Sequence, residues 1–89
     1  MNHLALAVVN AAAFFELSGD EIVDPDSAVK ALEDIAASLA GAGPDEMSAL
    51  REALHFERKA RSARGADEDT LEFFDSFMES FGLENPDDE

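Results

Sequence analysis

The chain has 89 residues and a formal net charge of −15, with 21 acidic and 6 basic residues. It contains no cysteine, which excludes disulfides and thiolate metal sites. The negative charge opposes binding to nucleic acid and to anionic membranes, so we expect neither as a partner. A chain of this length is expected to form one domain with a modest hydrophobic core.

The first predicted element is the apolar stretch 4–17, in which the only polar residues are Asn10 and Glu16. Its alanines and leucines favour a helix, and its apolar residues fall on every side of that helix. We therefore expect it to be covered on most sides, by other helices of the chain or by a second subunit, with Asn10 buried or at the edge of a contact. The stretch is too short to span a membrane. Residues 1–10 lack the Lys or Arg of a signal peptide, and we expect a cytoplasmic protein.

The second and third helices have clear start signals. Asp24 is a favourable N-cap, and Pro25 after it is a favourable first helical residue. Apolar residues recur at helical spacing from there until Gly41, which ends the element. The third helix is predicted over 44–63, beginning at a proline and ending before an Arg-Gly pair.

The fourth helix is predicted to begin at a capping aspartate, either Asp67 or Asp69. Gly82 and Leu83 fit a Schellman stop, in which a left-handed glycine lets the next residue fold back onto the helix. The remaining residues, 84–89, are acidic and contain no apolar side chain to bury. We expect them to form a disordered tail.

Four helices with short connections and no candidate strand predict an all-α fold, a compact and mostly antiparallel bundle of four helices. The domain is expected to span residues 1–83. The predicted core consists of the large apolar side chains on the helical faces, namely Phe14, Phe15, Leu32, Ile35, Leu50, Leu54, Phe74, Phe77 and Phe81.

Charge is distributed unevenly along the chain. Residues 51–64 contain five of the six basic residues, whereas residues 65–89 contain ten acids and no base. One interpretation is that the basic segment neutralises acidic neighbours inside the bundle, and the helix dipole also favours cations near the C-terminus of a helix. The other is that the segment presents a surface to a partner. The candidate interaction surface comprises Arg58, Lys59, Arg61 and Arg64.

Two patterns in the sequence are candidates for a metal site. Glu52 and His55 have the i, i+3 spacing of di-iron helix bundles, but such sites need a second motif and two further glutamates. The other histidine, His3, has no glutamate three residues before it. The acidic loop 20–26 lacks the ligand spacing and the glycine of an EF-hand. We expect no metal, and Glu52 with His55 is more simply an exposed pair.

The segment Asp26-Ser27-Ala28 begins the second helix of a small acidic four-helix protein. In this it resembles the acyl carrier protein family, in which the serine of an Asp-Ser-Leu motif carries phosphopantetheine. The resemblance implies Ser27 as the attachment site. The chain departs from the family in having Ala28 in place of leucine, a shorter first loop and a basic third helix. The other interpretation is a first-turn serine beside an N-cap.

A second resemblance spans most of the chain. The segments Phe-Glu-Leu-Ser at 15–18, Val-Asp-Pro-Asp at 23–26 and Phe-Gly-Leu at 81–83 resemble small acidic helical proteins of uncharacterised bacterial families. This resemblance implies a helical fold and no particular activity. The sequence shows no nucleophile–base pair in a hydrolase context and no glycine-rich phosphate loop, so we expect neither an enzyme nor a cofactor.

These observations favour a non-enzymatic protein–protein interaction module whose acidic surface suits a basic partner. An immunity protein, an antitoxin or an inhibitor that mimics the charge of nucleic acid would have this composition. The alternatives are an acyl-carrier-like domain modified at Ser27 and a carboxylate metal-binding bundle. Because the first helix is apolar all round, we also expect a homodimer in which the first or fourth helix meets its copy.

Overall fold

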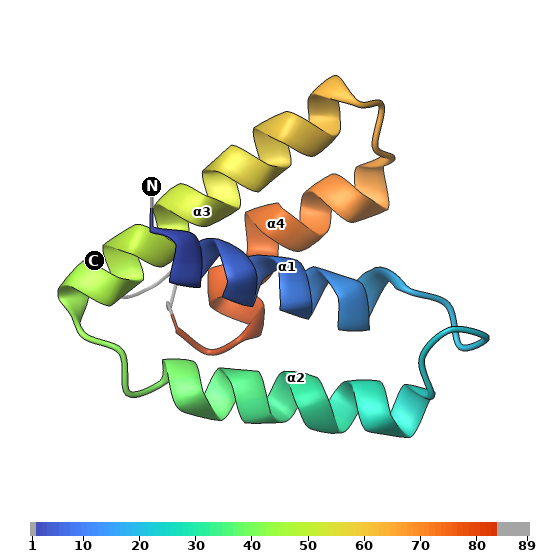
Figure 1. The fold of residues 1–89 in the computed structure, drawn as a ribbon, viewed down its shortest axis with the longest axis horizontal. Helices are drawn as coiled ribbons and strands as arrows, with labels where there is room; N and C mark the ends of the chain where they lie inside the picture. Colours follow the sequence, from blue (N-terminus) through green and yellow to red (C-terminus); the bar gives the residue numbers. More distant parts are fainter. Residues whose placement is uncertain (1, 84–89) are drawn as a thin grey trace.

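Four α-helices joined by short loops make up residues 2–83, the part of the chain that the computed structural model describes (Figure 1). They are α1 (His3–Leu17), α2 (Pro25–Leu39), α3 (Pro44–Ala63) and α4 (Glu68–Ser80). The predicted all-α four-helix fold is confirmed, and residues 2–83 contain no strand. The predicted acidic tail, 84–89, lies outside the described residues. None of the helices within 2–83 is both long and apolar enough to cross a membrane.

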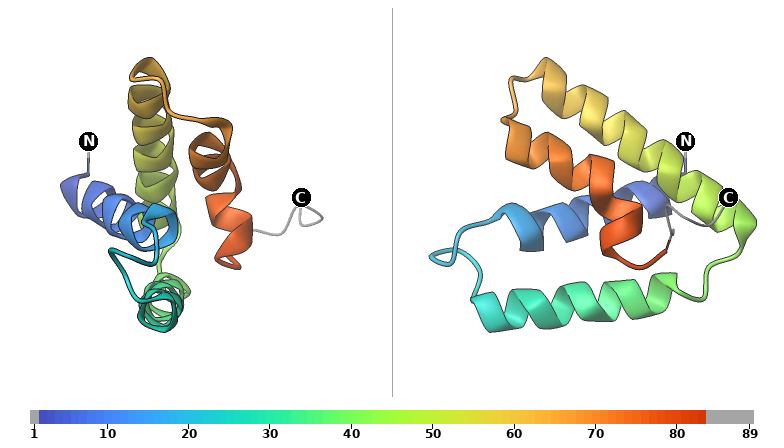
Figure 2. Two further views of the ribbon diagram at one scale, coloured as in Figure 1. Left: turned by 90° about the vertical axis from the view of Figure 1, so that its right-hand side faces the viewer. Right: turned by 180° about the vertical axis from the view of Figure 1, so that it is seen from behind.

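The helices form two antiparallel hairpins, α1 with α2 and α3 with α4 (Figure 1). The second hairpin is inclined to the first, so that α3 contacts α1 on one side and α4 on the other. α2 contacts α1 at the opposite edge of the molecule. Seen from the side, α1 therefore lies between α2 and α3, and the end of α4 reaches toward α2 (Figure 2).

Side-chain caps begin α2 and α4 where the sequence predicts them. The Asp24 carboxylate accepts a hydrogen bond from the Ser27 backbone N–H at 3.0 Å, with Pro25 as the first residue of α2. At α4 the cap is Asp67, whose carboxylate accepts from the backbone N–H of Thr70 at 2.9 Å. Each cap satisfies one of the amides that the first turn of a helix leaves unpaired.

Glycines end α3 and α4. Gly65 has a φ of 85° and Gly82 a φ of 70°, in the left-handed region that glycine enters without steric cost. After α4, the backbone N–H of Leu83 donates to the carbonyl of Met78 at 2.8 Å, and that of Gly82 donates to Glu79 at 3.0 Å. These two bonds define the Schellman motif, so the predicted stop of α4 is confirmed.

The core lies where α1, α3 and α4 meet. Its centre is Phe77, which is fully buried and stacks on Phe81 with 4.1 Å between ring centroids. Ala12 of α1 and Ala53 of α3 have no exposed surface, consistent with a close approach of these two helices. The buried cluster comprises Val9, Ala12, Ala13, Leu50, Ala53, Leu54, Phe74, Phe77 and Met78. Of the predicted core residues, Leu50, Leu54, Phe74 and Phe77 are buried, while Phe15, Leu32, Ile35 and Phe81 are half-buried.

Within the single chain, α1 is covered along one stripe only, so the expected cover on its other sides would have to come from a second subunit. Only Val9, Ala12 and Ala13 of this helix are buried, a stripe at the helical spacing of three and four residues. Phe14, predicted to be a core residue, is 52% exposed, because it lies about 100° around the helix from Ala13. Leu4 is 80% exposed. The neighbouring helices cover one stripe of α1 and leave apolar surface on the rest.

Candidate functional site

The predicted basic surface divides into cations that join helices and cations that face solvent. Arg58 of α3 donates from Nε to the Oδ1 atom of Asp75 in α4 at 2.7 Å. Arg61 is half-buried, whereas Lys59 and Arg64 are exposed. Arg58 and Arg61 therefore make contacts between helices, whereas Lys59 and Arg64 remain on the surface.

Arg61 is the centre of a polar network between α1 and α3. Its Nε atom donates to the Oε1 atom of Glu57 at 3.2 Å, and its Nη2 atom donates to the Oδ1 atom of Asn10 at 3.1 Å. Its guanidinium lies 5.1 Å from the ring centroid of Phe74, a cation–π contact. Glu57 is 8% exposed, and Arg61 compensates its charge. Asn10, expected to be buried or at the edge of a contact, is an exposed residue at the edge of the α1–α3 contact.

The other candidate residues from the sequence do not converge on a site. Glu52 and His55 are exposed on α3, and the described residues contain no group of three or more His, Asp or Glu side chains placed to hold a metal ion. His3 is exposed at the first position of α1. Ser27 is exposed in the first turn of α2, with its backbone N–H engaged by Asp24.

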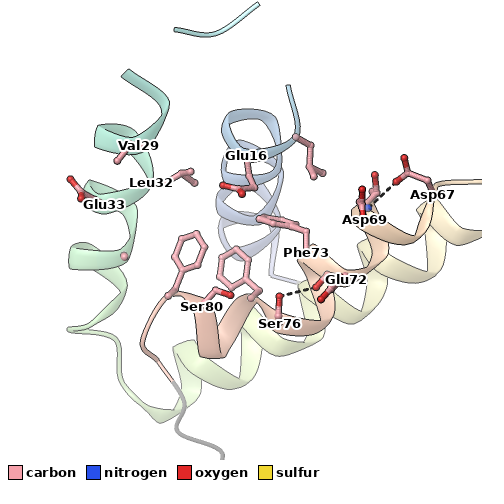
Figure 3. A pocket seen from close by; sticks show the side chains of 15 residues that line it. Glu16, Val29, Leu32, Glu33, Asp67, Asp69, Glu72, Phe73, Ser76 and Ser80 are labelled. Carbon is pink, nitrogen blue, oxygen red and sulfur yellow. Dashed lines mark hydrogen bonds between the residues drawn. The ribbon is translucent and has the colours of Figure 1, made fainter. Parts of the chain in front are cut away.

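A groove opens between the C-terminal end of α1, one face of α2 and one face of α4 (Figure 3). Its volume is about 770 Å³. The floor is apolar and is formed by Leu32, Ala36, Phe73, Phe77 and Phe81. All five floor residues are buried or half-buried, so α2 and α4 place a continuous apolar strip at the bottom of the groove.

Aromatic contacts fix the floor on its α4 side. Phe73 packs edge-to-face against Phe74 and Phe77, with centroid distances of 5.1 and 5.6 Å. Phe77 in turn stacks on Phe81. Edge-to-face and stacked rings stabilise each other beyond their buried area. The α4 wall is therefore a preformed surface anchored in the core.

The rim of the groove is acidic. Every ionisable residue that lines it is a carboxylate, and no Lys or Arg is among its lining residues. All of these carboxylates are exposed. They come from three helices and the cap of α4, and comprise Glu16, Glu33, Asp67, Asp69 and Glu72. The groove therefore combines an apolar floor with a rim of negative potential (Figure 3).

The ionised form of Asp67 is stabilised by local hydrogen bonds. The backbone N–H of Thr70, and then its side-chain hydroxyl, donate to the carboxylate and lower the pKa of Asp67 from its ordinary value of 3.8. Hydrogen bonds to the charged form of a carboxyl group stabilise that form. The N-cap of α4 thus also keeps a negative charge on the rim at acidic pH.

Sequence reasoning missed this groove, although part of its signal is visible. Phe73, Phe77 and Phe81 recur at a spacing of four residues, and Val29 and Ala36 recur at seven, so each helix carries apolar residues beside its core stripe. The sequence does not reveal that these two stripes face each other across a gap. That depends on the orientation of α2 relative to α4.

Comparison of the chain with protein-family models, with curated proteins and with solved structures finds no match.

Proposed function

We propose that this protein is a non-enzymatic interaction module that binds a basic partner protein through its acidic surface. The observation that carries the proposal is the groove between α2 and α4, whose lining contains five carboxylates and no basic residue. An apolar strip bordered by like charges is the composition of a binding surface with an apolar centre and a polar rim. The net charge of −15 adds a long-range attraction for cationic proteins.

An immunity protein, an antitoxin or an inhibitor that mimics nucleic acid can act by covering a basic site on another protein, and this chain has the size and charge for such a role. Its surface would act by occupying the partner rather than by chemistry. Electrostatic steering would make association fast at low ionic strength and slower as salt screens the charges.

The proposal is tested by capturing partners from cells of the source organism and reconstituting the complex from purified components. We expect a partner whose contact surface is basic, and an association rate that falls at least severalfold between about 50 and 300 mM salt. An acidic partner, or a complex whose association rate is independent of salt, would contradict the proposal. Intact-mass measurement of the captured protein also tests the acyl-carrier alternative, which requires a phosphopantetheine adduct on Ser27.

A second copy of the chain is the other partner that the structure supports, through α1. Leu4, Ala7, Ala11 and Phe14 are all exposed and recur at a spacing of three, four and three residues. This spacing places them on one stripe of α1, on the side not covered by α2 or α3. We propose that this α1 stripe packs against its copy in a two-fold dimer.

Sedimentation velocity at low and high salt tests the α1 dimer. A dimer held by apolar contact should persist at high salt, and replacing Ala11 by glutamate should dissociate it. As a control, replacing the exposed Ala37 of α2 by glutamate should leave the dimer intact. A wild-type protein that sediments as a monomer at high concentration excludes this dimer and leaves the α1 stripe facing solvent.

A further inference from the structure

We propose that the groove between α2 and α4 is the docking site for one amphipathic helix of a basic partner. The apolar face of that helix would lie on the floor of the groove, and its lysines and arginines would pair with the rim. The inference rests on the proposed function and specifies where the partner binds and in what conformation.

The first argument is the apolar surface that the groove leaves in contact with water. Val29 is 55% exposed and Leu17 is 37% exposed at its edges, while Leu32 and Phe73 are half-buried below them. In Figure 3, Leu32 points from α2 into the space between α2 and α4. An amphipathic helix places anchors at positions i, i+3, i+4 and i+7, which is the pattern that a groove between two helices accepts.

The size of the groove suits a helix. A cylinder with the diameter of a helix, about 10–12 Å, and one turn long has a volume of about 400–600 Å³. The groove volume of about 770 Å³ is larger than that of one helical turn, so the groove has room for part of a helix. A half-inserted helix buries its apolar stripe and keeps its polar face in water.

The arrangement of the rim charges specifies a partner with several cations. Glu33 lies on α2, Glu16 at the end of α1, and Asp69 and Glu72 on successive turns of α4. The charges thus lie on different sides of the apolar floor (Figure 3). A helix with basic residues flanking its apolar stripe on both sides would pair with them, whereas a single cationic group would reach only one side.

Charge also argues against the other occupants. The segment 84–89 carries four acids and no base, so the rim would repel it. A second copy, with a net charge of −15, brings its own acidic surface to the same rim. Nucleic acid and anionic membranes are repelled for the same reason. A basic protein helix is the occupant that both the floor and the rim attract.

The α2 wall of the groove differs from the α4 wall in how it is held. Its one buried residue is Ala28, and its only ion pair in the described part of the chain, Lys30 with Asp34, stays within the helix. Within residues 2–83, the side-chain hydrogen bonds of α2 are formed inside the helix or with its N-cap, and none joins α2 to another helix. The groove therefore has one wall fixed by aromatic packing and one wall held by apolar contact alone.

The test uses a fluorescently labelled 18-residue peptide of leucine and lysine, arranged as an amphipathic helix, and a scrambled peptide of the same composition. Fluorescence anisotropy with the full chain at about 50 mM salt should give a dissociation constant at least about tenfold lower for the helical peptide. Equal binding of the two peptides would mean that only charge is recognised, and would overturn the proposal.

Two groove variants and two matched controls locate the site. Val29→Arg places a cation on the apolar edge, and Glu33→Lys with Glu72→Lys reverses two rim charges. The control for the first is Ile22→Arg, an exposed apolar residue (68%) outside the groove. The control for the second is Glu21→Lys with Glu52→Lys, which changes the net charge equally at exposed sites outside the groove. Far-UV circular dichroism confirms that each variant is folded.

We expect both groove variants to weaken binding by at least about tenfold and both controls by less than about threefold. If the groove and control variants weaken binding equally, the groove is not the docking site, although a basic partner could still bind elsewhere on the acidic surface and the proposed function would stand. If the helical peptide displaces a captured basic partner from the wild-type protein, both the proposed function and the docking site are supported. A wild-type dimer that Val29→Arg converts to a monomer would show that a second copy occupies the groove, and would overturn this inference alone.

Discussion

The two sides of α1 are held in different ways. Toward α3, the helix has a polar link as well as apolar packing, since Arg61 bonds both Asn10 of α1 and Glu57 of its own helix. Toward α2, the contact rests on apolar side chains, and the polar interactions of α2 stay within that helix. Arg61 thus links α3 to α1 through Asn10, while it also compensates the charge of the buried Glu57 on its own helix.

The difference explains where the groove lies. α3 and α4 are joined by packing in the core and by the ion pair between Arg58 and Asp75. The main contact of α2 is with α1, and the groove lies between α2 and α4.

The largest expected difference between the two sides is in the cost of truncating an apolar side chain. Replacing the fully buried Phe77 by alanine should lower the free energy of unfolding by about 3–5 kcal/mol. Replacing the half-buried Leu32 of α2 by alanine should lower it by about 1–2 kcal/mol, because part of that side chain already contacts water. Urea unfolding followed by circular dichroism measures both values.

If Phe77→Ala prevents folding, the milder Phe77→Leu gives the same comparison with a smaller cavity. Equal losses at Phe77 and Leu32 would contradict the assignment of α2 to the weakly packed side.

A smaller difference is expected between the two ion pairs that are formed within a helix. Replacing Glu57 by alanine should cost about 1–3 kcal/mol, because it leaves the half-buried Arg61 without its carboxylate. Replacing Asp34 by alanine should cost less than about 0.5 kcal/mol, since the side chains of Lys30 and Asp34 are 76% and 68% exposed. The same unfolding assay compares the two, and a cost at Asp34 that equals or exceeds that at Glu57 would refute the structural role of Arg61.

The smallest expected effect is the pH dependence of the α4 cap. Since the pKa of Asp67 is lowered in the folded protein, its carboxylate stabilises the fold at pH values above its ordinary pKa of 3.8. That contribution is lost as the pH falls through the lowered value. We therefore expect Asp67→Asn, which retains a capping side chain but cannot titrate, to melt below the wild type near pH 6.

The difference in melting temperature between the wild type and Asp67→Asn should narrow steadily as the pH falls below 3.8. Asp69→Asn, at an exposed position two residues further along, is the control. A difference that stays constant between pH 6 and pH 2.5 would show that hydrogen bonding by Thr70 does not perturb the carboxyl group.

The sequence by itself determined the helices. The bounds of α3, Pro44–Ala63, agree with the prediction, and Asp24 and Gly82 act as the sequence predicts. The physical reason is that caps and stops are local: each depends on bonds between groups no more than about five residues apart. The apolar content and the acidity likewise follow from composition alone.

The tertiary structure decided how each helix is rotated about its own axis. This rotation determines which side chains are buried and where the groove lies. Phe77 is buried and Phe14 is exposed, although both lie in strongly apolar segments, because each helix turns only one stripe toward its neighbours. Arg61 bonds Asn10, which lies 51 residues away in the sequence, and so becomes part of the bundle rather than a free surface cation. The groove arises in the same way: its floor and rim come from three helices, and no local pattern specifies the rotation and separation that bring them to one place.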